Sequence, residues 1–151
     1  MWAPLRRFRT LPWYAKLDFV RAVLLLPLVR NSLRLRGFRA TQKSLQSRPE
    51  RGVVALSDAA AVEQTQQLCR IVLAAARYSP LSFTCLERSL VLRRLLGSRR
   101  ISAQLRIGAR KNGDKFEAHA WVERNGAAVG EFDGTHLHYA AFEQEFFEEL
   151  S

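Results

Sequence analysis

Two Asn-Gly dipeptides in the second half of the chain constrain its fold more than any other feature. They stand at 112–113 and 125–126, between segments in which apolar and polar residues alternate. Asn-Gly in this setting is the strongest short signal for a β-hairpin, because both residues tolerate the positive φ of a tight turn. Two successive hairpins predict an antiparallel meander. Its three strands and a candidate extension are expected at 101–110, 116–123, 128–132 and 137–139.

The residues before this sheet carry helical signals instead. Ser57 or Asp58, both good N-cap residues, begins a helix that Pro80 closes. Thr84 and Glu87 form the S/T-x-x-E pattern of a capping box, which opens a further helix. Helices first and a sheet second is an α+β arrangement, with the capped helix packed on the antiparallel meander.

An earlier helix is predicted from Pro12 to near Gly37, with a kink at Pro27. We expect its apolar band to pack on the core. The band consists of Tyr14, Leu17, Val20, Leu24 and Leu28. The helix is also rich in arginine, so docking on a partner protein or a membrane surface is the alternative role. Its uncharged run 22–29 is far shorter than the roughly 18 residues of a membrane span.

The length of 151 residues suits one compact unit with one core. Within it, we distinguish a basic amphipathic helical segment at 1–40 from a core at 53–151. The polar residues 41–52 between them are predicted to be a loop or linker.

Charge and cysteine content narrow the class of protein. The net charge of +10 favours acidic partners such as an acidic peptide or an anionic membrane surface. No nucleic-acid-binding motif accompanies the charge, so we expect no nucleic acid partner. The two cysteines, Cys69 and Cys85, are too few for a disulfide scaffold and indicate a reducing compartment, which we take to be the cytoplasm.

One cysteine stands where a catalytic thiol would stand. Cys85 is the first residue inside the capped helix, where unpaired N–H groups and the helix dipole stabilise a thiolate. His119 lies on the middle strand and is a candidate base for it. Glu131 and Asp133 share one face of the next strand, and either carboxylate could orient the histidine. Cys69 lies on the apolar side of its helix and is expected to be a buried, inert thiol.

No cofactor or metal site is predicted. His136 and His138 form a His-x-His, but further ligands with suitable spacing are lacking. We expect both histidines at the surface of the sheet edge. Trp121, which shares a strand face with His119, is expected to pack in the core beside the candidate base.

Several sequence strings together resemble one known family. They are Cys-Leu-Glu-Arg-Ser-Leu-Val-Leu from Cys85, Leu-Leu-Gly, Ile-Gly-Ala-Arg-Lys and Ala-His-Ala-Trp-Val-Glu-Arg-Asn-Gly around His119. Through these strings, the chain resembles the lasso peptide biosynthesis leader peptidases over nearly its whole length. This family is the stand-alone protease form of the lasso B protein and belongs to the transglutaminase-like superfamily. The resemblance implies a papain-like core with a Cys-His-Asp triad. Cys85 matches the nucleophile and His119 the base. The family's aspartate falls on Glu131 rather than on Asp133, and this is where the chain departs from the family.

The resemblance also implies a substrate and partners. The substrate would be a ribosomally made precursor peptide, cut between leader and core through a thioester. A small leader-binding protein would deliver the precursor, and a separate lasso cyclase would close the ring. Two alternatives stand beside this hypothesis. One is an acyl transferase or transglutaminase-type enzyme with the same triad, and the other is a non-catalytic basic binding module.

Overall fold

The structure is a computed structural model that describes residues 12–46, 56–130 and 134–142. Within these ranges the helices precede the strands, which confirms the predicted α+β class. The elements in chain order are α2 (Trp13–Ser44), α3 (Asp58–Tyr78), α4 (Cys85–Ser98), β1 (Gln104–Asn112), β2 (Lys115–Arg124), β3 (Ala127–Val129), the 3-10 helix η1 (Thr135–His138) and β4 (Ala140–Ala141).

The four described strands form one antiparallel sheet in the order β3-β2-β1-β4. Both hairpins are confirmed. In the second, Asn125 and Gly126 have φ of 51° and 77°, as an Asn-Gly turn of the predicted type requires. In the first, the two turn residues are Gly113, with φ of 61°, and Asp114, because Asn112 still pairs with Lys115 in the sheet. The turn thus lies one residue later than the predicted Asn112-Gly113 turn. Only glycine adopts such a φ without steric cost.

The predicted strand extension at 137–139 is wrong. Thr135–His138 forms a 3-10 turn that follows Gly134 in a left-handed conformation. The chain then places β4 on the free edge of β1, where Ala140 lies opposite Ala109. The turn carries the chain from the β3 side of the sheet to the β1 side, so the final strand cannot continue the meander.

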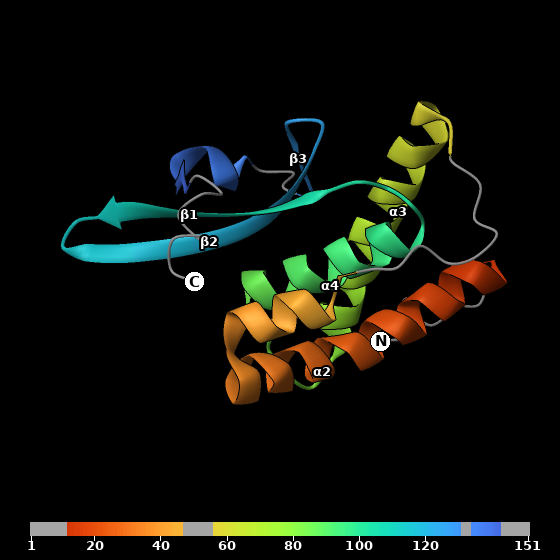
Figure 1. Cartoon of the computed structure of the whole chain (residues 1–151), viewed down its shortest axis with the longest axis horizontal. Helices are drawn as coiled ribbons and strands as arrows, with labels where there is room; N and C mark the ends of the chain where they lie inside the picture. Colours follow the sequence, from red (N-terminus) through yellow and green to blue (C-terminus); the bar gives the residue numbers. More distant parts are fainter. Residues whose placement is uncertain (1–11, 47–55, 131–133, 143–151) are drawn as a thin grey trace.

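Helix α4 lies at the centre of the molecule. It contacts α2, α3 and β2, and Figure 1 shows it between the sheet and α2. Its apolar side chains form the core with those of the other two helices. The largest fully buried ones are Leu26, Leu68, Leu90 and Leu96. This position fixes the start of α4 against the sheet.

Helix α2 packs with the opposite face from the predicted one. The inner face consists of Ala15, Asp18, Ala22, Leu26 and Val29, which are all buried. The predicted core band Tyr14, Leu17, Val20, Leu24 and Leu28 is instead 43–62% exposed. Small alanine side chains on the inner face allow α2 to approach α3 and α4 closely, and the larger side chains lie outside. Among the described residues, no helix is long and apolar enough to cross a membrane.

The end of α2 also differs from the prediction. Helical φ and ψ continue through Pro27, and the break lies at Gly37, with φ 78° and ψ 175°. The chain turns back there and resumes a helix to Ser44 (Figure 1). Thr41 is fully buried, and its hydroxyl donates to the Gly37 carbonyl at 2.8 Å. Residues 41–44 are therefore helical rather than part of a loop, because this buried hydroxyl anchors the return segment.

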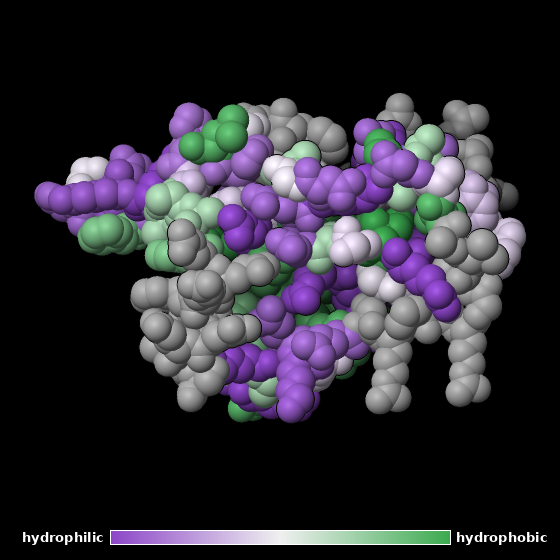
Figure 2. Space-filling view, turned by 45° about the horizontal axis from the view of Figure 1, so that its top comes forward, coloured by the Kyte–Doolittle hydropathy of each residue, from purple (hydrophilic) through white to green (hydrophobic). Residues whose placement is uncertain are grey.

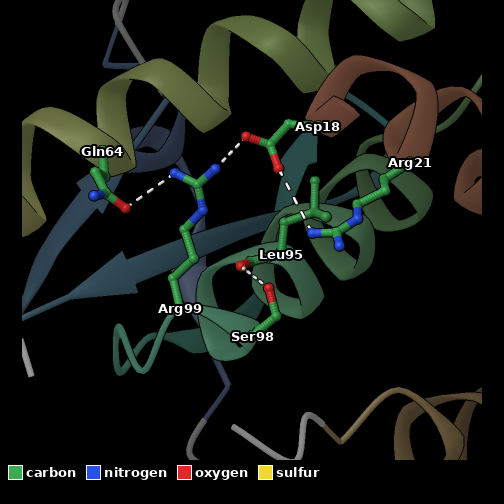
Figure 3. A network of polar contacts seen from close by, with 6 residues as sticks. All are labelled: Asp18, Arg21, Gln64, Leu95, Ser98 and Arg99. Atoms are coloured by element: carbon green, nitrogen blue, oxygen red, sulfur yellow. Dashed lines mark hydrogen bonds and ion pairs between the residues drawn. The ribbon is translucent and has the colours of Figure 1, made fainter. Parts of the chain in front are cut away.

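A polar cluster connects α2 and α3 with the far end of α4 (Figure 3). Arg99, just after α4, donates to the carboxylate of Asp18 in α2 and, at 2.9 Å, to the amide oxygen of Gln64 in α3. Arg21 lies 4.0 Å from the same carboxylate. Asp18 is only 2% exposed, and a buried carboxylate is tolerated when a cation pairs with it. The pairing connects residues 81 positions apart and has no local signature in the sequence.

Candidate active site

The capping box at the start of α4 is present in full. The Thr84 N–H donates to the Glu87 carboxylate at 2.7 Å, and the Glu87 N–H donates to the Thr84 hydroxyl at 3.3 Å. Cys85 is the first residue of the helix, as predicted. Among the described residues, no hydrogen bond occupies the Cys85 N–H. The thiol therefore lies at the positive end of the α4 dipole, beside a backbone donor.

The segment that leads into α4 is held by α2. The Arg30 guanidinium donates to the Ser82 carbonyl at 2.9 Å and lies 6.0 Å from the centre of the Phe83 ring. A cation over an aromatic face adds to the hydrogen bond. These contacts fix the chain two and three residues before Cys85, so the position of the thiol depends on α2 as well as on the capping box.

His119 lies in β2, close to two aromatic rings. Its ring centre is 5.9 Å from that of Trp121, with the planes at 20°, and 5.1 Å from that of Tyr139. Trp121 is 3% exposed, and its indole N–H donates to Glu123 at 2.9 Å. Trp121 is thus buried beside His119, as predicted. The two neighbouring rings restrict the orientation of the imidazole.

Trp121 covers a glycine in the next strand. A Cβ atom at Gly108 would lie 3.0 Å from the indole ring and 2.8 Å from the backbone oxygen of Ala140. Backbone cannot yield to such an overlap as a flexible side chain could. Only glycine at this position lets β4 and the indole pack closely over β1.

Tyr139 is in turn held by a charged pair, which the sequence analysis missed. The Arg110 guanidinium lies 4.7 Å from the centre of the tyrosine ring and donates to Glu117 at 2.7 Å. The Tyr139 hydroxyl lies 3.5 Å from the same carboxylate. Hydrogen bonds from Asn112 and Arg110 lower the pKa of Glu117, so it is a carboxylate at neutral pH. The hairpin register places Arg110 opposite Glu117 and could have revealed this pair, but not Tyr139.

Cys85 and His119 line the same cavity, which has a volume of about 380 Å³. Four consecutive residues of β2, from His119 to Val122, line it together with Val129 of β3 and the following Gly130. The Ser89 hydroxyl of α4 donates to the Ala120 carbonyl at 3.1 Å and ties the cysteine helix to this part of β2.

Comparison with known families identifies this architecture. The model of the transglutaminase-like superfamily matches residues 22–143, which include Cys85 and His119. The chain belongs to the transglutaminase-like superfamily. This superfamily includes cysteine peptidases and acyl transferases, and its members are often cysteine-dependent enzymes. No curated protein and no solved structure matches the chain.

The carboxylates predicted to orient the histidine of this transglutaminase-like site, Glu131 and Asp133, lie outside the described residues. Gly130, the last described residue before them, lines the cavity, and so does Thr135, two residues after Asp133. The assignment of the third triad member stays a prediction.

The second cysteine also lines the cavity but has a different environment. Cys69 is 2% exposed, and burial raises the pKa of its thiol to about 11. Gly130 packs against it, since a Cβ there would lie 3.3 Å from the sulfur. Neither cysteine forms a disulfide. Cys69 is a buried, protonated thiol at neutral pH, as expected from its place on the apolar side of α3.

The two histidines of η1 differ in their exposure to solvent. His138 is exposed, whereas His136 is half-buried, with its ring centre 6.0 Å from that of Trp121. The prediction that both lie at the surface is therefore wrong for His136, because the 3-10 turn places it over β2. Among the described residues, no three His, Cys, Asp or Glu side chains group closely enough to hold a metal ion.

Proposed function

We propose that this transglutaminase-like chain is a cysteine peptidase in which Cys85 is the nucleophile and His119 the general base. The observation that carries the proposal is that both side chains line one cavity, with Cys85 at the capped start of α4. A helix start favours the thiolate over the thiol, and an adjacent imidazole can accept the thiol proton.

The reaction follows from these positions. The Cys85 thiolate attacks a peptide carbonyl carbon, and the Cys85 N–H at the helix start donates to the resulting oxyanion. The C–N bond then breaks, and protonated His119 gives its proton to the departing amine. A thioester remains on Cys85. His119 next removes a proton from water, the hydroxide attacks the thioester, and the acid product leaves as the thiolate is restored.

A carboxylate beside His119 would hold the productive tautomer of the imidazole. We rank Glu131 slightly ahead of Asp133, because Glu131 occupies the position of the family's aspartate. Gly130 and Thr135, which lie close to these carboxylates in the sequence, line the cavity, which supports a carboxylate from this segment. The rings of Trp121 and Tyr139 beside His119 support the same orientation.

The sequence resemblance supports a more specific substrate, a ribosomally made lasso precursor cut between leader and core. A separate leader-binding protein would deliver the precursor, and a separate lasso cyclase would use the freed amine of the core. The net charge of +10 suits an acidic peptide partner. Two cysteines without a disulfide suit the cytoplasm, where thiols stay reduced.

The proposal is tested by mass spectrometry of a lasso precursor incubated with the protein and its leader-binding partner. The wild type should release leader and core as two hydrolysis products. Cys85→Ala should release neither, whereas the matched variant Cys69→Ala should retain cleavage. Equal cleavage by wild type and Cys85→Ala would exclude Cys85 as the nucleophile. A product in which the leader is joined to an added amine, with no free acid, would replace hydrolysis by acyl transfer.

The same assay resolves the third triad member. Glu131→Gln and Asp133→Asn each remove one charge with little change in shape. Loss of the orienting carboxylate should lower kcat by about 10⁴, as in other triads. The variant with the larger loss identifies that carboxylate, and equal small losses would exclude both.

A further inference from the structure

Six apolar side chains form a ridge along the outer face of α2, which we call the α2 ridge. They recur three, four or seven residues apart and lie within an arc of roughly 80° at 100° per residue. They are 43–84% exposed. The ridge consists of Trp13, Leu17, Val20, Leu24, Leu28 and Leu35. From Trp13 to Leu35 it is about 33 Å long. It lies opposite the buried residues Ala15, Ala22 and Leu26 and is separate from the cavity of Cys85.

Basic residues flank this ridge. By helical spacing, Lys16 and Arg34 lie on one side of it and Arg21 on the other, each within about 90° of its centre. Asp18 is the sole acidic residue in the sequence of α2, and it is buried and bound by Arg99. The outer face of α2 is therefore apolar along its crest and positive along its sides. The basic residues of the helix are Lys16, Arg21, Arg30, Arg34, Arg36, Arg39 and Lys43.

These charges help to decide which kind of partner the α2 ridge can bind. A second copy of the chain would bring two sets of basic flanks together, which like-charge repulsion disfavours. A protein partner would need a groove to receive a convex ridge and an acidic rim along both sides. An anionic bilayer meets both conditions without special shape, since apolar side chains enter the acyl–headgroup boundary and basic ones remain among the phosphates. Trp13 and Tyr14 at the start of the ridge are residues that prefer such an interface.

We propose that the α2 ridge binds the surface of an anionic lipid bilayer. The helix lies in the plane of the interface, with the ridge inserted and the inner face still packed on α3 and α4. This binding does not depend on the proposed peptidase activity, because no ridge residue lines the catalytic cavity.

The test is flotation of the full chain with vesicles of phosphatidylglycerol and phosphatidylcholine, compared with phosphatidylcholine alone. The wild type should bind the anionic vesicles more tightly, with a loss of binding as salt increases. Leu24→Glu and Leu28→Glu should each weaken binding at least tenfold, because each removes a buried apolar side chain from the membrane. Both residues are more than half exposed, so the fold should tolerate the changes, which circular dichroism would verify.

Phe116→Glu is the matched control. Phe116 is 81% exposed and belongs to the β1–β2 hairpin, whose outer end, at the left of Figure 2, is mostly hydrophilic. The same change of charge there should alter binding within about threefold. Arg34→Gln should weaken binding to anionic vesicles about fivefold and leave binding to phosphatidylcholine unchanged.

Three results would overturn the proposal. The first is a wild type that does not bind anionic vesicles. The second is an equal loss of vesicle binding for Leu24→Glu and Phe116→Glu, which would mean that only the net charge of the protein matters. The third is a ridge variant that keeps vesicle binding but dissociates a dimer or a complex with the leader-binding protein, which would assign the ridge to a protein instead.

Discussion

Helices α2 and α4 share one core but differ in what they expose. Every residue of α4 is at least partly buried, and the helix contacts α2, α3 and the sheet. One side of it lines the cavity from Cys85, at its first position, to Leu92. Helix α2 instead is buried along one face and carries the exposed α2 ridge along the other. The central helix α4 therefore presents a candidate catalytic residue at its N-terminus, whereas the peripheral helix α2 presents an exposed surface along its length.

The chain's two thiols give the largest expected difference. At pH 8 a thiol with a pKa of about 11 is ionised in only about one molecule in a thousand. Iodoacetamide should therefore alkylate Cys85 and leave Cys69 unmodified, until the pH rises toward 11 or the protein unfolds. Peptide mapping after timed quenching measures both rates. Equal rates at pH 8 would contradict the contrast between the start of α4 and the interior of α3.

The two faces of α2 should differ nearly as much in stability. Leu26 is fully buried, and Leu26→Ala should lower the free energy of unfolding by about 2–5 kcal/mol through lost burial and a cavity. Leu24 is 59% exposed, and Leu24→Ala should change it by at most about 0.5 kcal/mol. Urea denaturation measures both. A larger loss of unfolding free energy for Leu24→Ala than for Leu26→Ala would indicate that the outer face packs in the core, as the sequence pattern predicts.

The buried ion pair between α2 and the end of α4 ranks next. Asp18→Asn should lower the free energy of unfolding by an amount toward the lower end of about 3–5 kcal/mol. Arg99 would lose its counter-ion, but water reaches its side chain, which is 21% exposed, and reduces the loss. Arg21→Gln is the control, since this partly exposed cation at 4.0 Å should contribute at most about 1 kcal/mol. Thermal unfolding of both variants separates the contributions. Similar losses would indicate that the Arg21 contact, and not the Arg99 contact, carries most of the stabilisation.

The capping box should contribute less to stability than Leu26 or the buried ion pair. Thr84→Ala removes the hydroxyl that accepts a hydrogen bond from the Glu87 N–H, and it should lower the free energy of unfolding by about 1 kcal/mol. Thr84→Ser keeps a hydroxyl and should retain most of that stability. The loss falls on the turn that carries Cys85, so hydrogen exchange should increase at the start of α4 and not in α2. Uniform changes in exchange would show that the cap does not act locally.

What could be predicted from the sequence follows the range of the interactions. Thr84 and Glu87 are three residues apart, and each hairpin turn uses the glycine of its own Asn-Gly dipeptide. Local chemistry therefore sufficed for the start of α4 and for β1 to β3. Helix α2 is apolar on two faces, and only the positions of α3 and α4 decide which one is buried. The alanines of the inner face, Ala15 and Ala22, were the overlooked sign of close helix packing.

The site divides in the same way. Cys85 and His119 could be singled out because each stands in a distinctive local context, and the structure brings them to one cavity. Tyr139 was missed, because its contact with His119 depends on the turn at Gly134 and on β4 joining the far edge of β1. Non-local pairing of a two-residue strand leaves almost no pattern in a sequence.

The central claim is that Cys85 and His119 act as one nucleophilic pair, and covalent labelling tests it most directly. A leader peptide ending in a chloromethyl ketone would be incubated with the wild type and with His119→Ala, and the labelled residue identified by peptide mapping. We predict that the label forms on Cys85 and that His119→Ala slows labelling at least about a hundredfold. A label on Cys69, or a rate on Cys85 that is unchanged without His119, would contradict the account.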